Sequence, residues 1–596
     1  LGYQPIMGSD GQWIQLANLL EHLFIASIEA LDLMVDVLGD PRYATAPRLD
    51  PEAAEEVRNM MLERARTRPA AEWMKAFYEN GNVAAELVGT AQEGLKNADL
   101  VANGEVLDLP TRQFGTVTQL GAVARLTDTP ASIVGDIPDI GEHTNEVLGA
   151  LAPRAMPAPD AAVAPLSAGG SGRPPLEGIT VLEFATIIAA PLGASFLADF
   201  GARVIKVEPV GGGDPMRNFG VGLGAYIGAS KTNAGKESIC IDLKNPEGQE
   251  IVRRLLADAD IVIHNYRPGV PERLGIGYEM ARELNPGIIY VSANGYQPDG
   301  PSARRPCAHP IPGAVNGGAL LQAGVAWPPD TSTIDGIREA ARQYFRSNEA
   351  NPDPNTSMVV TTAAMLGLAA RRRTGVGQQI FTSMLGANGY ANYDDFLSFE
   401  GKWQTRPELD GELHGLGACY RLYRSADGWV FLGIRSDAEW QQFCSATGQS
   451  DLGADARFAT AAGRKEHDSV LSEQLAALFA ARPSLEWEQM LIPQGVGCVQ
   501  ASSVPPGDFY LNDPQMRENG FIQEADHQLW GRYFRHGPNV AFTDTPGRYR
   551  PGVLAGANTD ALLAEAGYSE DEIAVLRATG VVDHTEPMEL PVPVGV

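Results

Sequence analysis

The sequence contains little cysteine and little positive charge. Its five cysteines are odd in number, widely spaced and never arranged as C-x-x-C, which disfavours both a disulfide-stapled scaffold and a zinc knuckle. Lys and Arg number 46 against 74 Asp and Glu, which gives a net charge of -28. Binding of a phosphate backbone requires clustered basic side chains, and here they are scattered. We therefore expect no metal, no nucleic-acid partner and a reducing, cytoplasmic location.

Long hydrophobic runs are also missing. The most apolar early stretch, "LLEHLFIASIEALDLMVDVLG" at 19–39, is interrupted every few residues by Glu, His or Asp. It therefore predicts an amphipathic helix and no membrane span, and no signal peptide is visible. At 596 residues the chain exceeds one compact core, so we expect two or more domains that act on small molecules.

A Pro/Ala/Gly-rich stretch over 152–175 has the composition of a linker. After it, strand-like runs at 178–184, 202–209, 259–265 and 287–295 alternate with helix-like segments. This alternation indicates a parallel sheet in a doubly wound α/β domain, whose ligand lies beyond the carboxyl ends of the strands.

The piece before the linker resembles the end of the chain. "LGYQPIMGSDGQWIQLAN" matches "LGACYRLYRSADGWVFLGI", "RTRPAAEWMKAF" matches "AARPSLEWEQML", and "IGEHTNEVLGAL" matches "LAGANTDALLAEAG", in the same order. The pattern predicts an internal repeat that relates residues 1–150 to 416–570. The first copy has no counterpart of the α/β half and the chain opens on Leu1. We therefore expect either a fragment of a longer tandem protein or a missing half that a second polypeptide supplies.

One carboxylate stands in an unusual place. "NPDPNTSM" at 351–358 sets Asp353 between two prolines, just ahead of a strongly helical run. Asp is a common helix cap. A helix N-terminus also favours an ionised carboxylate that could act as a nucleophile. From these residues alone both interpretations of Asp353 stay open.

Several longer segments resemble the family III CoA-transferases, also called the CaiB/BaiF family. They include "LEGITVLEFATIIAAPLGASFLADFGARVIKVEPVGGGDPMR", "IDLKNPEG", "HNYRPGVPERLGIGYEMARELNPGIIYVSANGY", "RRRTGVGQQIFTSM" and "NDPQMRENGF". The resemblance implies a doubly wound, Rossmann-like large domain, a smaller α+β domain and an interlocked dimer, or a pseudo-dimer in a tandem chain. It assigns 1–151 to the end of an incomplete first unit, 152–175 to a linker, 176–580 to a complete unit (large domain 176–400 and 525–580, small domain 405–520) and 581–596 to a tail.

The resemblance also implies a chemistry. In this family an aspartate relays CoA from an acyl-CoA to a small carboxylic acid through a mixed anhydride and an aspartyl-CoA thioester. Counting back from "RRRTGVGQ" places that aspartate at Asp353. The CoA positions of the family fall on eight further residues: Ile187, Ile188, Ala189, Leu243, Lys244, Asn265, Tyr266 and Arg273.

Departures from the family pattern limit the choice of substrate. Pro209 replaces an arginine that many members have after "IKVE". The segment 325–350 is longer than usual and predicts an added helix beside the active site. The glycine-rich runs at 211–213 and 220–228 predict loops, since neither gives G-x-G-x-x-G after a strand. Gly415 and Gly417 are candidates for a glycine loop over the aspartate, or for a plain connection.

Three further functions compete with a simple transferase. The α-methylacyl-CoA racemases of the same family use a His and an Asp, and His309 in "RRPCAHPIPG" lies one position from the expected histidine, with the following Asp absent. A CoA-transferase with lyase activity would also fit a tandem chain. The third candidate is a non-catalytic half of a larger complex.

Overall fold

The computed structural model describes residues 1–133, 136–151, 172–218, 230–324, 331–347, 352–402, 409, 412–529, 531–537 and 539–583. It contains two compact units, the first formed by residues 1–320, 341–402 and 520–596 and the second by 321–340 and 403–519. The main stretch of the second unit lies within two residues of the expected small domain at 405–520. Most of the expected linker, the glycine-rich run at 220–228 and residues 584–596 of the expected tail lie outside the described residues.

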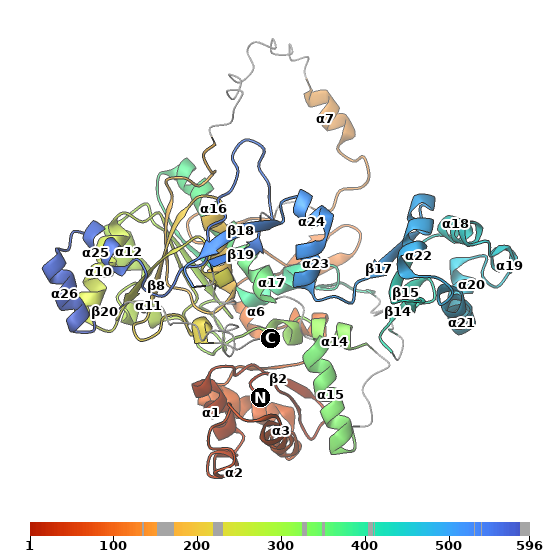
Figure 1. Cartoon of the computed structure of the whole chain (residues 1–596), viewed down its shortest axis with the longest axis horizontal. Coiled ribbons are helices and arrows are strands. Elements are labelled where there is room, and N and C mark those ends of the chain that lie inside the picture. Colours follow the sequence, from red (N-terminus) through yellow and green to blue (C-terminus); the bar gives the residue numbers. More distant parts are fainter. Residues whose placement is uncertain are drawn as a thin grey trace. The chain divides into compact units, whose positions relative to one another are not determined.

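An eight-stranded sheet forms the centre of the first unit (Figure 1), in the order β20-β9-β8-β7-β10-β11-β12-β6. From β9 to β12 along this order the strands run parallel to their neighbours, and β20 and β6 are antiparallel at the edges. By chain position the parallel strands follow the order 3-2-1-4-5-6 of doubly wound folds, so the predicted α/β class is confirmed. The strands are β6 (Arg125–Leu126), β7 (Thr180–Glu183), β8 (Arg203–Glu208), β9 (Glu237–Ile241), β10 (Ile261–His264), β11 (Ile289–Asn294), β12 (Gln379–Ser383) and β20 (Val582–Asp583).

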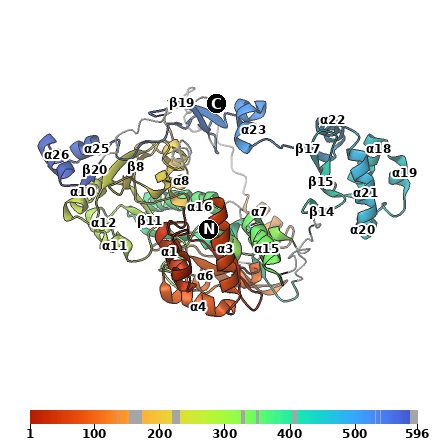
Figure 2. The same cartoon turned by 60° about the horizontal axis from the view of Figure 1, so that its bottom comes forward.

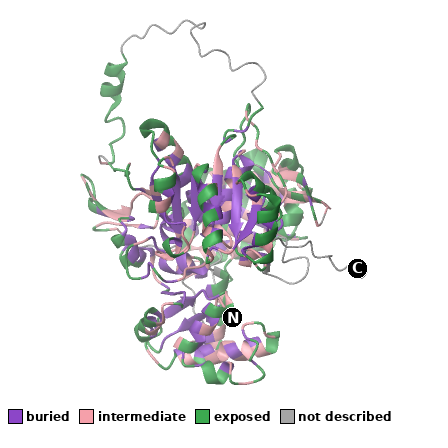
Figure 3. Cartoon of the chain, turned by 90° about the vertical axis from the view of Figure 1, so that its left-hand side faces the viewer, coloured by how far each residue is buried: buried purple, intermediate pink, exposed green. Residues whose placement is uncertain are grey.

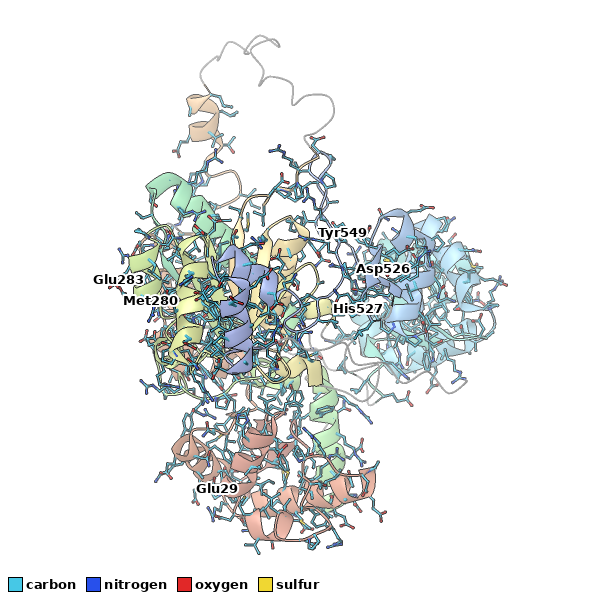
Figure 4. All side chains as sticks on the ribbon, turned by 60° about the vertical axis from the view of Figure 1, so that its left-hand side comes forward. Glu29, Met280, Glu283, Asp526, His527 and Tyr549 are labelled. Carbon is cyan, nitrogen blue, oxygen red and sulfur yellow. The ribbon has the colours of Figure 1, made fainter. Side chains whose placement is uncertain are left out.

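Buried Val and Ile build these strands, because branched side chains suit a pleated surface covered on both faces. One face packs against α10, α12, α25 and α26, and the other against α8 and α16 (Figure 2). Figure 3 shows the buried strands between helices whose outer faces are exposed. On α12, Met280 packs against the hydrophobic core between the sheet and α10, α12, α25 and α26, while Glu283 is exposed (Figure 4). The helices are α8 (Ala189–Asp199), α10 (Pro246–Ala257), α11 (Val270–Arg273), α12 (Tyr278–Leu284), α16 (Pro352–Thr374), α17 (Met384–Ala391), α25 (Thr559–Glu565) and α26 (Glu570–Ala578).

Two helices of one layer approach unusually closely. A Cβ at Gly193 on α8 would lie 2.7 Å from the carbonyl oxygen of Ser357 on α16, and Thr361 Oγ1 donates a hydrogen bond of 3.1 Å to the Gly193 carbonyl. Crossover helices in such a fold run antiparallel to the strands, so both helices begin at the carboxyl edge of the sheet. The contact therefore couples the helix that carries Asp353 to the helix that follows Ile188.

The first segment, residues 1–126, folds within the same unit as the sheet. Its antiparallel sheet β1-β2-β3 packs against α3 and α4, and its last strand, β6, pairs with β12. The elements are β1 (Pro5–Met7), β2 (Trp13–Leu16), α1 (Glu21–Ala30), α2 (Met34–Val37), α3 (Pro51–Ala65), α4 (Ala70–Asn80), β3 (Ala85–Leu87), α5 (Ala91–Gly94), α6 (Ala98–Ala102), β4 (Val106–Thr111) and β5 (Gly115–Leu120), followed beyond the segment by α7 (Thr144–Ala150).

The second unit surrounds the sheet β14-β15-β16-β17 with short helices whose core contains Trp440, Phe443, Phe479 and Trp487. Its elements are β14 (Gly415–Gly417), β15 (Tyr420–Arg424), β16 (Trp429–Gly433), α18 (Asp437–Thr447), α19 (Ser450–Ala454), α20 (Ala461–Glu466), α21 (Asp468–Phe479), α22 (Ser484–Leu491), β17 (Gly497–Ala501), α23 (Pro506–Asn512) and α24 (Pro514–Glu518), and the chain then enters the first unit through β18 (Ile522–His527) and β19 (Gly531–His536). None of the helices in the described part of the chain is long and apolar enough to cross a membrane.

The first segment and the second unit share local geometry as well as element order. Trp73 Nε1 donates to the carbonyl of Ala65 at 2.8 Å, and Trp487 Nε1 donates to that of Phe479 at 2.9 Å, eight residues back in each case. Both tryptophans lie on helices preceded by a proline cap, and a guanidinium lies over each ring. These matches support the predicted internal repeat.

Candidate active site

Asp353 lies in the first turn of α16, at the carboxyl edge of the sheet. Its side chain is 10% exposed, and its Oδ2 lies 2.7 Å from Nδ1 of His309, which is 26% exposed. A carboxylate can only accept a hydrogen bond, so His309 must carry its proton on Nδ1 and donate it. The structure therefore brings together two residues that are 44 positions apart.

The first turn of α16 is fixed independently of Asp353. Thr356 Oγ1 and Asn388 Nδ2 donate to the carbonyl of Pro352, at 2.7 and 3.2 Å. Asp353 is the second residue of the helix, so it lies inside the helix and not ahead of it as a cap would. Its carboxylate is thus directed by His309, near the positive end of the helix dipole.

The first segment supplies a third member of this site. The Tyr3 ring lies nearly parallel to the His309 ring, at 12° and 6.4 Å between centroids. His309 itself precedes α13 (Pro310–Val315), whose backbone touches the first segment, since the Gly89 amide donates to the Ala314 carbonyl at 3.0 Å. Residues from the first segment and from α16 therefore surround the same imidazole.

The residues expected beside the nucleotide lie at the switch point between β7 and β10. Ile187 has a positive φ of 74°, Ile188 caps α8, and Ala189 is its first residue. Asn265, just after β10, binds Thr186, the residue before Ile187. Its side chain accepts a hydrogen bond from the Thr186 amide at 3.0 Å and donates one to the Thr186 carbonyl at 2.8 Å. Ligands of doubly wound sheets bind at this crevice.

Other expected CoA positions divide into buried and exposed residues. Leu243 is buried in the sheet core, and Tyr266 is half-buried, with its pKa raised to about 12 by burial. Lys244 and Arg273 are exposed, Arg273 donating to the Gly269 carbonyl at 3.2 Å. Exposed cations at this edge suit phosphate groups.

Gly415 and Gly417 do not form the expected loop. They form the edge strand β14 of the second unit, where a Cβ at Gly415 would meet the Tyr420 carbonyl at 2.4 Å and Gly417 has φ +150°. The close backbone approach accounts for glycine at these positions, and a role for them at the active site stays a prediction. The expected added helix in 325–350 exists as α15 (Ile334–Ser347), with residues 325–330 and 348–350 outside the described residues, and its Tyr344 packs on Trp13 at 5.0 Å.

Sequence reasoning missed three residues at this edge. Asp214 binds the Ile187 amide, Arg267 lies close enough to Arg273 for the two charges to interact, and Tyr3 stacks on His309. Burial, with the neighbouring Arg273 charge, lowers the pKa of Arg267. A signal existed for Arg267, which stands two residues after Asn265 in "HNYRPG", but Tyr3 is distant in sequence from every other member.

Comparisons with known proteins identify the family of the chain. The chain belongs to CoA-transferase family III, whose family model matches residues 3–144 and 176–555. Over 432 residues it is 30% identical to a succinyl-CoA-D-citramalate CoA-transferase of Chloroflexus aurantiacus, covering 69% of this chain and 100% of that protein. It is 28% identical over 425 residues to a succinyl-CoA:glutarate CoA-transferase of Mus musculus, with 69% and 91% covered.

Two further matches concern length and fold. A probable CoA-transferase of Mycobacterium tuberculosis, Rv1866, is 28% identical over 380 residues, which are 63% of this chain and 46% of that protein. A solved CaiB/BaiF family protein of Brucella suis has a TM-score of 0.54 and 26% identity, covering 66% of this chain and all of that one. The predicted family and fold are therefore confirmed, and the chain is an enzyme of the CoA-transferase kind.

Proposed function

We propose that the enzyme moves CoA from an acyl-CoA to a carboxylic acid with Asp353 as covalent relay. The observation that carries this proposal is the Asp353 carboxylate, largely buried in the first turn of α16 and held by His309 at 2.7 Å. A fixed and poorly hydrated carboxylate is a better nucleophile than a solvated one. The unpaired amides of a helix N-terminus suit the negative charge that develops during acyl transfer.

The reaction divides into four displacements. Asp353 attacks the donor thioester carbonyl and the C–S bond breaks. CoA thiolate is released, and a mixed anhydride of Asp353 and the donor acid is formed. The thiolate then attacks the aspartyl carbonyl and expels the donor acid, leaving an aspartyl-CoA thioester. The acceptor carboxylate attacks that thioester and releases the thiolate, which finally attacks the acceptor acyl group and frees Asp353. No oxidant or net proton is required.

Coenzyme A would span from the switch point to Asp353. The loop at Ile187–Ala189 and the pair Asn265 and Tyr266 would lie against the nucleotide, with Lys244 and Arg273 facing its phosphates. Support comes from their shared position at the carboxyl edge and from the α8–α16 contact at Gly193. Relatives named for succinyl-CoA, glutarate and D-citramalate make dicarboxylic acids the first donors and acceptors to assay.

Asp353→Asn tests the relay. It keeps the shape of the side chain and removes the nucleophile, so we expect transferase activity to fall by at least about 1,000-fold, in line with loss of a covalent nucleophile. Hydroxylamine added with acyl-CoA should give a hydroxamate at residue 353 in the native enzyme, detected by mass spectrometry of the peptide. Asp335→Asn, on an exposed aspartate 82% accessible, is the matched control. Full activity of Asp353→Asn would refute the relay.

The second candidate function is α-methylacyl-CoA racemisation, because the site contains a His and an Asp. Racemases need an acid and a base on opposite sides of one carbon, which sets them about 5–6 Å apart if each reaches the carbon over roughly 3 Å. Here the two groups are 2.7 Å apart and bonded to each other, which supports the transferase. Exchange of the α-proton in D2O, without CoA transfer, would support the racemase instead.

Product analysis separates the remaining two candidate functions from the transferase. A transferase with lyase activity would release a smaller acid together with acyl-CoA, visible by chromatography of the complete reaction. A non-catalytic half would bind CoA without turnover even in the complete assembly.

For that assembly we propose an interlocked pseudo-dimer of two units. The repeated geometry of Trp73 and Trp487 supports it, as does a relative of which the matched region covers 46%.

A further inference from the structure

Ile187 has a backbone conformation that its side chain disfavours. Its φ of +74° lies in the left-handed region, where a β-branched residue is a genuine outlier. It is one of four residues other than glycine with positive φ in the described chain, together with Asp32, Gln297 and Leu413. Strain of this kind persists where surrounding contacts enforce it, and it concentrates at functional sites.

The backbone amide of Ile187 is bound by Asp214. Both of its carboxylate oxygens accept from the Ile187 amide, at 3.0 and 3.2 Å, and Oδ1 also accepts from the Met216 amide at 2.9 Å. Asp214 is fully buried. Asp214 directly follows three glycines with positive φ, at 211–213. A Cβ at Gly213 would lie 2.6 Å from Glu208 Oε2. The glycine run therefore serves to place one carboxylate.

A buried ion cluster holds Asp214 in turn. Lys206 Nζ lies 2.9 Å from Asp214 Oδ2 and 3.1 Å from Glu183 Oε1, and Lys236 Nζ contacts the other oxygen of Glu183. The Asp214 amide donates to Glu208 at 2.8 Å. Arg217 pairs with both oxygens of Glu208 at 2.7 Å.

The cluster is balanced in charge and built to be rigid. Three carboxylates face three cations, all less than 10% exposed, on the strands and loops around β7, β8 and β9. Although burial opposes it, pairing with Arg217 and Lys206 lowers the pKa of Glu208 to about 2. Buried ion pairs add little net stability compared with apolar packing, so geometric specificity is the better reason for such a cluster.

We propose that Asp214 is a positioning residue for coenzyme A: it forces Ile187 into the left-handed conformation and thereby aims the backbone of Ile188 and Ala189, at the start of α8, toward the nucleotide. This inference rests on the proposed function for its ligand. It adds a residue that contacts no substrate but sets the shape of the loop that does. Because the loop is shaped before CoA arrives, binding needs no reordering of it.

Titration calorimetry with CoA and steady-state kinetics with acyl-CoA test the proposal. Ile187→Gly lets this residue adopt many backbone conformations, so the loop is no longer shaped before CoA binds. We expect it to raise the Kd for CoA and the KM for acyl-CoA at least about tenfold, with kcat within about threefold because Asp353 is untouched. Asp214→Ala should weaken CoA more than Asp214→Asn, which keeps an oxygen to accept from the Ile187 amide.

The matched control is Asp32→Gly, which relieves a positive φ of 57° in the first segment, away from β7 and α8, and should leave the Kd unchanged. An Ile187→Gly enzyme with a higher Tm and an unchanged Kd would overturn the inference, since the strain would then be incidental. If Asp214→Ala does not fold, Ile187→Gly still decides. Failure of the native enzyme to bind CoA at all would instead refute the proposed function.

Discussion

The first segment contains the three-stranded sheet β1-β2-β3 and the second unit the four-stranded sheet β14-β15-β16-β17, and the corresponding faces of the two sheets differ in chemistry. Strand pairing aligns Met7↔Trp13 with Arg424↔Trp429. We extended this alignment along the strands and through the next strand pair of each sheet. In it, Tyr3 corresponds to Tyr420, Gln15 to Phe431 and Glu86 to Val499. In the first segment the polar residues Gln15 and Glu86 are 0% and 6% exposed, whereas Tyr420 and Val499 are 44% and 47% exposed.

The difference shows that the residues packed against a face of the sheet, and not the sheet itself, decide whether its side chains are polar or apolar. The first segment lies against Arg305, Tyr296 and α13, so its buried Glu86 receives hydrogen bonds from Arg305 at 2.9 Å and from Tyr296 at 3.0 Å. A buried charge is tolerated only with such partners. On the corresponding face of the second unit, Tyr420 and Val499 are exposed to water, carry no charge and need no such partner.

The largest expected effect comes from disrupting the contacts that bury the polar face of the sheet β1-β2-β3. Arg305 Nη1 pairs with Glu86, Nη2 donates to the Ala85 carbonyl at 2.5 Å, and the guanidinium lies 4.1 Å over the Tyr78 ring. Arg305→Met leaves Glu86 buried without its cation, so we expect a loss of about 3–5 kcal/mol. Because the chain has two units, local hydrogen exchange of β3 is the appropriate measurement.

The control for Arg305 is the double variant Arg305→Met with Glu86→Leu, which removes both charges and should recover most of the lost protection of β3. Arg424→Met, at an exposed site, should change exchange of its own strand by less than about 0.5 kcal/mol. Unchanged protection of β3 in the single variant would mean that the burial of this face does not depend on the ion pair.

A second, smaller effect concerns pH. Glu105 follows Gly104 (φ +67°), and Phe521 follows Gly520 (φ +70°) near the end of the chain. Glu105 is buried, its pKa is raised to about 7 by burial, and it accepts from Ser383 Oγ at 2.7 Å. A raised pKa gives stability that is complete below about 4.5 and is lost as pH rises through about 7, by on the order of 2 kcal/mol.

Glu105→Gln keeps a side chain that can pair with Ser383 but cannot ionise. We expect its stability to stay level between pH 5 and pH 8 while that of the native chain falls, as measured by local hydrogen exchange around β12. Phe521→Gln, at a position 38% exposed, should leave the pH profile of the native chain unaltered. A native profile without loss between pH 5 and 8 would contradict the burial of an ionisable Glu105.

Much of this architecture follows from patterns along the chain, and the rest does not. The four strand-like runs became β7, β8, β10 and β11 because buried Val and Ile at such spacing suit a parallel strand. Counting from "RRRTGVGQ" selects Asp353 as the candidate relay, and that choice stays a prediction. By contrast, Asp214 matters because the Ile187 backbone is left-handed, and Tyr3 matters because it meets a ring 306 positions away. Neither backbone strain nor a contact across such a distance is written in local sequence.

The smallest expected effect is on the exposed face of the second unit. Val499→Thr replaces one methyl with a hydroxyl at a site 47% exposed, and Tyr420→Ser shortens a residue 44% exposed. Neither should change the stability of β15 or β17 by more than about 1 kcal/mol in this chain, because water already reaches both side chains and Tyr420 loses only its edge contact with the Phe431 ring. Tyr3→Ser is the matched variant in the first segment, and there we expect impaired turnover because the ring lies against His309. A large loss of protection of β17 in this chain alone would mean that the face is already covered, and the contrast between the two copies would then disappear.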